Sequence, residues 1–109
     1  MISYKISKNF IIVIINASII NEALFVKLNN LYSKYKKYQK VLDITNLKNI
    51  DYKLMKFINK SNIKLINKNT SNFLSLFLTK ADKYLKIYNS EQDLVINNTI
   101  VKRRLKLYN

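Results

Sequence analysis

KVLDITNLKNIDYKLMKFI, residues 40–58, holds a strand, a polar turn and the start of a helix in immediate succession, and it decides the fold class. The mostly apolar residues 41–44 predict a short strand, and the polar residues that follow, 45–49, predict a loop. Asp51 stands where the N-cap of a helix over 52–60 belongs. In open α/β sheets, ligands bind outside the carboxyl ends of the strands. We therefore expect any site of this protein at this corner.

An antiparallel hairpin is predicted at the start of the chain. Alternation of apolar and polar residues over 2–6 indicates a half-buried strand, and the apolar run 10–15 indicates a central strand buried on both faces. Between them, Lys8 and Asn9 make a tight turn, in which we expect Asn9 to adopt the left-handed conformation.

The rest of the chain alternates helices with strands. A loop at 16–20 precedes the longest helix, for which Asn21 is the expected N-cap. Ser90 with Asp93 three residues later is a variant of the capping box at the start of the last helix. The longest helix is expected to end at about Lys37, and a further helix to begin at Thr70 or Ser71. Strands are expected at 63–66 and 84–88, and the last helix is expected to end at about Asn97.

The resulting order is β-β-α-β-α-β-α-β-α. It predicts an α/β fold with a mostly parallel central sheet, an antiparallel N-terminal hairpin and about four helices. At 109 residues the chain is large enough for a single core. We expect one domain over 1–97, followed by a basic C-terminal tail over 98–109.

The composition argues against catalysis. His, Cys, Gly, Pro and Trp are all absent, so there is no imidazole base, no thiolate nucleophile, no disulfide and no soft metal site. Only six acidic residues are present, and they are scattered along the chain. We therefore expect no enzymatic activity and no catalytic residues, and neither a cofactor nor a metal ion.

The formal net charge of +14 is typical of proteins that bind nucleic acid or anionic membranes. However, the basic residues are eighteen Lys and two Arg, and 65 of the 109 residues are Phe, Tyr, Met, Ile, Asn or Lys, all of which have codons rich in A and T. A strongly AT-rich genome produces this composition by drift. The charge is therefore weaker evidence for a nucleic-acid partner than its size suggests.

A secretory signal is not expected, although Lys5 and Lys8 precede the apolar run 10–15. Asn16 and Ser18 interrupt the apolar segment, and no small residue stands at the required position before the cleavage point. No stretch of roughly 18 apolar residues is present either, so we expect no stable membrane insertion. The expected location is the cytoplasm or an organelle matrix.

The end of the longest helix, LYSKYKKYQK (31–40), interleaves tyrosines with lysines. Such a pattern can stack nucleic-acid bases and neutralise phosphates. Alternatively, Tyr32 and Tyr35 pack on the sheet while the lysines are solvated. We favour the second interpretation.

Three segments in the correct order resemble the STAS domain, the fold of anti-sigma factor antagonists and of the cytoplasmic tails of sulfate transporters. They are IVIINASIINEALFVKLNNL (12–31), VLDITNLKNID (41–51) and YLKIYNSEQDLV (84–95), and the resemblance covers roughly residues 2–97. It implies a protein-binding module. The implied partner is an anti-sigma-type kinase or the ATPase subunit of a membrane transporter, and both remain open.

In regulatory members of that family, the corner Asp is followed by two small hydroxyl residues and a Gly, and a partner kinase phosphorylates the second hydroxyl. Here Tyr52, Lys53 and Leu54 follow Asp51, so we expect no serine phosphoswitch. The start of a helix carries a partial positive charge, which Lys53 would make permanent. Otherwise, Asp51 is only a helix cap and Tyr52 only a surface aromatic residue. The expected partner contacts are Asn46, Asn49, Asp51, Tyr52, Lys53 and Lys56, with Ala17 and Ser18 of the loop 16–20.

A second functional class stays open, that of a basic RNA-binding or ribosome-associated protein of an AT-rich bacterium or organelle. Its contacts would be the lysines of the helix end and the basic cluster of the tail, Lys102, Arg103, Arg104 and Lys106. The oligomeric state also stays open, because the apolar strand 2–6 permits association between strands.

Overall fold

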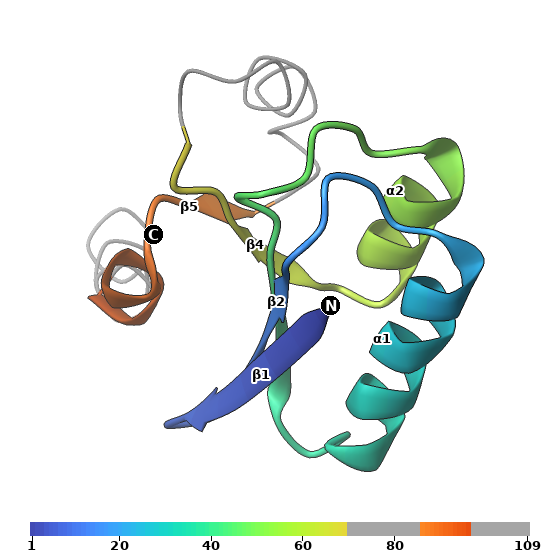
Figure 1. Ribbon diagram of the computed structural model, residues 1–109. Helices are drawn as coiled ribbons and strands as arrows, with labels where there is room; N and C mark the ends of the chain where they lie inside the picture. The colour runs from blue at the N-terminus through green and yellow to red at the C-terminus, as the bar shows by residue number, and fades with distance from the viewer. Residues whose placement is uncertain (70–85, 97–109) are drawn as a thin grey trace.

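The computed structural model describes residues 1–69 and 86–96, which build one five-stranded sheet in the order β1-β2-β3-β4-β5 (Figure 1). β1 and β2 are antiparallel, and every other neighbouring pair is parallel, so the predicted α/β fold with a mostly parallel sheet is confirmed. The strands are β1 (Ile2–Ser7), β2 (Phe10–Ile15), β3 (Gln39–Asp43), β4 (Lys64–Ile66) and β5 (Ile87–Tyr88); the helices are α1 (Glu22–Lys34), α2 (Tyr52–Lys60) and a short helix at 91–96. The helix expected after Thr70 or Ser71, and the tail 98–109, lie outside the described residues.

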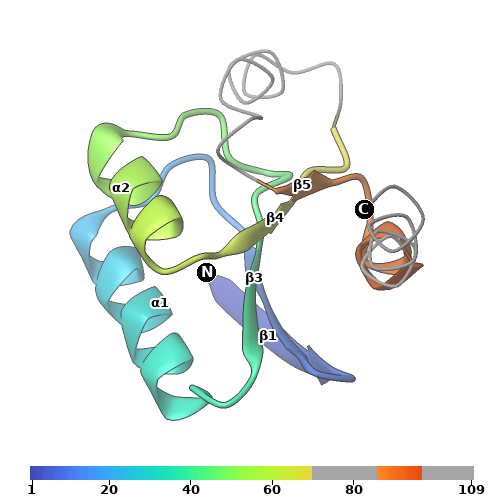
Figure 2. The ribbon, with the colours of Figure 1, turned by 180° about the vertical axis from the view of Figure 1, so that it is seen from behind.

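The two faces of the sheet are covered by different helices. α1 and α2 lie side by side on one face, and the helix 91–96 lies against the other (Figures 1 and 2). β2 contributes to both cores, because Ile11 and Val13 face α1 and α2 whereas Phe10 and Ile12 pack with Leu94. The prediction that β2 is a central strand buried on both faces is therefore confirmed.

The β1–β2 hairpin forms at the predicted turn but with a different backbone. Ser7 pairs with Phe10, which leaves Lys8 and Asn9 as the two-residue loop. Lys8 has φ 54°, and Asn9 is not in the left-handed region, so the expectation for Asn9 was wrong. Both two-residue turns that match the right-handed twist of the strands take positive φ at the first loop position, which is Lys8 here.

α1 begins as predicted and ends early. The Asn21 side chain accepts a hydrogen bond of 2.9 Å from the Leu24 N–H, as expected of an N-cap. The helix ends at Lys34 instead of Lys37, because the chain must turn to bring the Gln39 N–H to the Asn9 carbonyl, 2.7 Å away. The last turn holds Tyr32, which is buried and donates a hydrogen bond of 2.6 Å to the Val41 carbonyl.

Strand boundaries differ from the predictions by one to three residues. β3 was expected over 41–44 but covers Gln39–Asp43, and β4 begins at Lys64 instead of Ile63. β5 begins at Ile87, so Lys86 is outside the strand that was expected over 84–88. Residues 84 and 85 are not described. These differences leave the order of the elements unchanged.

The ends of the other helices agree with the sequence pattern. α2 covers 52–60 as predicted, and Asn62, with φ 55°, lies in the turn that leads into β4. At the last helix, the Ser90 hydroxyl accepts from the Asp93 N–H (3.0 Å), and the Asp93 carboxylate accepts from the Asn89 N–H (3.2 Å). The predicted cap by Ser90 is thus confirmed, whereas the return bond to Asp93 comes from Asn89, one residue before the cap, and so differs from that of a capping box.

Candidate functional site

The loops 16–20 and 44–51 lie side by side at the carboxyl end of the sheet, next to the start of α2 (Figures 1 and 2). β2 leads into the first loop and β3 into the second, and the two strands are parallel neighbours. The Lys48 N–H donates a hydrogen bond of 2.7 Å to the Ser18 carbonyl and so ties the loops together. Ala17 and Ser18, predicted from a distant part of the sequence, therefore belong to the same corner as Asn46 and Asn49. We call this region the carboxyl-end corner.

Asp43, the last residue of β3, organises the turn that begins the second loop. Asp43 as a whole residue is only 5% exposed. One carboxylate oxygen, Oδ1, accepts hydrogen bonds from the Thr45 N–H (3.0 Å) and from the Thr45 hydroxyl (2.6 Å). This side-chain turn directs the chain out of the sheet after Asp43.

The segment after β4 joins the same network. Lys68 Nζ lies 3.6 Å from Asp43 Oδ2, and the Lys68 N–H donates to the Thr45 hydroxyl oxygen (3.0 Å). Beside it, Asn67 is buried, and its N–H donates to the Tyr88 carbonyl (2.9 Å). Sequence reasoning missed this network. The available signal was Asp-x-Thr at a strand end, which is typical of a side-chain turn; the partner Lys68 could not be found from local sequence.

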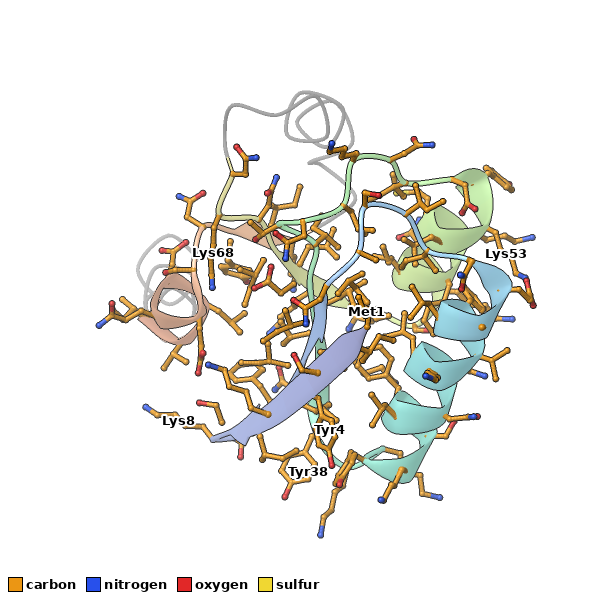
Figure 3. The ribbon with its side chains drawn as sticks, viewed as in Figure 1. Met1, Tyr4, Lys8, Tyr38, Lys53 and Lys68 are labelled. Carbon is orange, nitrogen blue, oxygen red and sulfur yellow. The ribbon has the colours of Figure 1, made fainter. Side chains whose placement is uncertain are left out.

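Asp51 and Lys53 each make an interaction within the fold, a hydrogen bond for Asp51 and an ion pair for Lys53. Asp51 Oδ1 accepts from the Leu54 N–H at 2.8 Å, so the predicted N-cap is confirmed. Lys53 Nζ lies 2.9 Å from Glu22 Oε2 at the start of α1, and 4.7 Å from the centre of the Phe25 ring. Glu22 thus balances the positive charge that the sequence suggested at Lys53. Figure 3 shows Lys53 where the starts of α1 and α2 meet.

The remaining predicted contacts are solvent-accessible. Asn46, Asn49 and Lys56 are exposed. Two large side chains of the corner are also strongly exposed: Tyr52 at 80% and Ile19, on the loop 16–20, at 59%. A shallow pocket of about 520 Å³ continues from Tyr52 along α2; it is lined by Tyr52, Met55, Lys56, Asn59 and Lys60. The carboxyl-end corner therefore combines fixed loops with exposed apolar surface.

The opposite end of the parallel strands is basic. Tyr32 packs on the sheet, as we favoured, and burial raises its pKa well above the ordinary value. Tyr35 is half-buried and its hydroxyl lies 2.9 Å from that of Tyr4, a hydrogen bond that raises the pKa of Tyr4. A pocket of about 310 Å³ lies nearby; its lining residues are Tyr38, Gln39, Lys40, Ser61, Asn62, Lys64 and Lys86. We call this region the amino-end pocket. The predicted tail contacts, Lys102, Arg103, Arg104 and Lys106, lie outside the described residues.

The described part of the chain also lacks two kinds of feature. Within residues 1–69 and 86–96, no helix combines the length and apolar character needed to cross a bilayer. No group of three or more acidic, Cys or His side chains in those same residues is placed to hold a metal ion. Comparison of the chain with models of protein families, with curated proteins and with solved structures gave no match.

Proposed function

We propose that this chain is a STAS-like, non-enzymatic module that binds another protein through the carboxyl-end corner. The observation that carries the proposal is the exposure of Tyr52 and Ile19 on segments that hydrogen bonds hold in place. Aromatic side chains such as that of Tyr52 are typical anchors of protein interfaces, and the nearby Ile19 adds exposed apolar surface. Binding would bury them without reorganising the loops, so little ordering entropy is lost on association.

A constitutive module fits this corner better than a phosphorylated switch. The second position after the Asp51 cap is Lys53, whose ammonium group is already paired with Glu22. No serine or threonine stands among the first three residues of α2, where a phosphate would meet the partial positive charge of the helix. An anti-sigma-type kinase or a transporter ATPase remains the proposed partner, and the cytoplasm or an organelle matrix the proposed location.

The proposal is tested by affinity capture from native cells with the wild-type chain and two variants, after nuclease treatment. Tyr52→Ala removes the exposed ring, and Lys53→Glu opposes Glu22 and reverses the charge at the start of α2. We expect the wild-type chain to retain a kinase or transporter ATPase in near-equal amount, and each variant to lose most of it. Truncating an aromatic anchor typically costs about 2 kcal/mol or more, which is roughly thirtyfold in affinity.

Lys37→Glu is the matched control, because it makes the same charge change at an exposed lysine away from the corner and from the pocket along α2. Thermal unfolding of all variants separates lost binding from lost folding. Equal capture by the wild-type chain, Tyr52→Ala and Lys53→Glu would show that the corner does not bind the partner.

A second candidate function is RNA binding at the amino-end pocket. The observation that favours it is that Lys40, Lys64 and Lys86 line this pocket together with Tyr38, and no acidic residue is among its lining residues. Lysines would neutralise phosphates, and the exposed part of the Tyr38 ring would stack on a base. Binding of a single-stranded RNA oligomer should then weaken steeply with salt, and Lys40→Glu with Lys86→Glu should flatten that dependence. An unchanged salt dependence in the double variant would exclude this pocket as the RNA site.

A further inference from the structure

β1 is an edge strand whose outer side is open in the part of the chain that the structure describes. It pairs with β2 on one side only. The Asn16 N–H donates to the Met1 carbonyl (2.8 Å), and in an antiparallel ladder such bonded pairs recur at every second residue. The N–H and C=O groups of Met1, Ser3, Lys5 and Ser7 therefore face β2, and those of Ile2, Tyr4 and Ile6 face outward. An outward row of unpaired backbone groups is a template for another strand.

An apolar groove runs along this edge, between β1 and α1. Its volume is about 340 Å³, and its lining residues are Ile2, Tyr4, Lys27, Asn30, Leu31 and Lys34. Tyr4 and Ile6, on the same face of β1, are both more than 40% exposed. Figure 3 shows Tyr4 on the α1 side of β1. An added strand would cover these side chains as well as satisfy the backbone groups.

Two lysines at the groove favour an added strand that carries negative charge. Lys27 and Lys34 are exposed, and neither has an acidic partner within the described residues. They are seven residues apart on α1, which places their Cα atoms about 10 Å apart along the helix axis. Lys5, on the other face of β1, is by contrast paired with Glu91.

We propose that β1 binds an extended acidic segment of another protein by strand addition, with the groove between β1 and α1 receiving one face of that segment. Alternate residues of a strand share a face, and residues four apart are about 13 Å from each other. A segment with the pattern acid-x-apolar-x-acid would therefore place its apolar side chain between Ile2, Tyr4 and Leu31. Its two carboxylates would reach Lys27 and Lys34, whose long side chains bridge the difference in spacing.

Charge argues against a second copy of this chain as the occupant. Antiparallel pairing of two β1 strands around a two-fold axis would place both α1 helices on the same face of the joined sheet. Lys27 and Lys34 of each copy would then approach those of the other without an acidic side chain between them. An acidic segment turns the same lysines into favourable partners, so the groove fits it better.

The test uses the full chain and a fluorescently labelled heptapeptide, TETVTET, whose anisotropy reports binding at low salt. The control peptide, TKTVTKT, has the same backbone and apolar residue with the opposite charge. We expect the acidic peptide to bind at least about tenfold more tightly, because two ion pairs and the relief of repulsion are involved. Tyr4→Pro, which removes an outward N–H and leaves the bonds to β2, should weaken binding of TETVTET by about tenfold.

A charge swap keeps the test decisive if the proline variant fails to fold. In the double variant Lys27→Glu, Lys34→Glu, the preference should invert, and TKTVTKT should bind more tightly than TETVTET. The matched control, Lys37→Glu with Lys60→Glu, has the same net charge and should keep the preference of the wild-type chain.

Three outcomes would overturn the proposal. The first is no binding of TETVTET up to about 1 mM, near the weak limit of specific recognition. The second is equal affinity of the wild-type chain for both peptides. The third is a wild-type dimer in sedimentation that Tyr4→Pro abolishes, since a second copy would then occupy the edge. The assay involves none of the residues of the carboxyl-end corner, so its failure leaves the proposed function untouched, and the reverse also holds.

Discussion

Replacing Asp43 by Ala should destabilise the protein measurably, because this carboxylate connects the segments after β3 and β4. The variant removes the acceptor of both Thr45 bonds, at 3.0 and 2.6 Å, and the partner of Lys68 Nζ at 3.6 Å. Asp43 is only 5% exposed, so water cannot replace the lost acceptor from the same direction. In the variant, the partly buried Thr45 N–H and hydroxyl lose their shared carboxylate acceptor.

The size of the effect follows from two opposing contributions. Each hydrogen bond to a charged acceptor contributes about 1.5–3 kcal/mol to stability, which sets an upper range of about 3–6 kcal/mol for the pair. Removing a buried carboxylate also removes its own desolvation cost, which is of the order of a few kcal/mol. The net loss should be about 2 kcal/mol, equivalent to a fall of about 10 °C in Tm for a domain of this size. Asp43→Asn keeps an oxygen acceptor and should lose about half as much.

Urea unfolding and thermal unfolding, both followed by circular dichroism, measure these losses. A double-mutant cycle with Thr45→Val isolates the coupling between the two side chains, which should be at least about 1 kcal/mol. A coupling near zero, or a Tm of Asp43→Ala within about 2 °C of the wild-type value, would refute the view that Asp43 fixes this turn.

Two further residues give predictions of the same kind. Tyr32→Phe leaves the buried Val41 carbonyl without the 2.6 Å bond and should cost about 1–2 kcal/mol in urea unfolding, whereas Tyr35→Phe, at a more exposed hydroxyl, should cost much less. Because burial raises the pKa of Tyr32 above 10.0, the stability it contributes is present below pH 10 and lost as the pH rises beyond it; Tyr32→Phe should reduce that alkaline loss, and an unchanged pH profile would contradict this. Asp51→Ala should lower stability by about 1 kcal/mol through the lost cap on Leu54, and Asp51→Asn by little; equal losses would mean that the cap does not hold α2.

Local sequence was sufficient for the elements whose ends are set by their own residues. α2 was predicted at both ends, because the Asp51 cap and the spacing of Leu54 and Ile58 are local signals. The hairpin was predicted for the same reason, since the alternation in β1 and the apolar run of β2 need no distant partner. The exposed positions Asn46 and Asn49 also followed from composition alone.

Features set by distant partners could not be predicted. Helix-forming residues continue past Lys34, and only the pairing of Gln39 with Asn9 explains why α1 ends there. The partners Lys53 and Glu22 are 31 positions apart in the sequence, so nothing local indicated that the Lys53 charge is balanced. In each case tertiary pairing decided between local alternatives that the sequence left open.

The acidic residues, unlike most of the lysines, stand at positions where they make bonds within the fold. Five of the six acidic residues lie in the described part of the chain: Glu22, Asp43, Asp51, Glu91 and Asp93. Each accepts a hydrogen bond or ion pair from a backbone N–H or a lysine. Acidic side chains thus stand where the fold requires them, whereas most lysines within residues 1–69 and 86–96 are at exposed positions. Net charge alone therefore does not identify a partner. Both proposed surfaces depend instead on the position of particular side chains: Tyr52 and Ile19 at the carboxyl-end corner, and the lysines beside the open edge of β1.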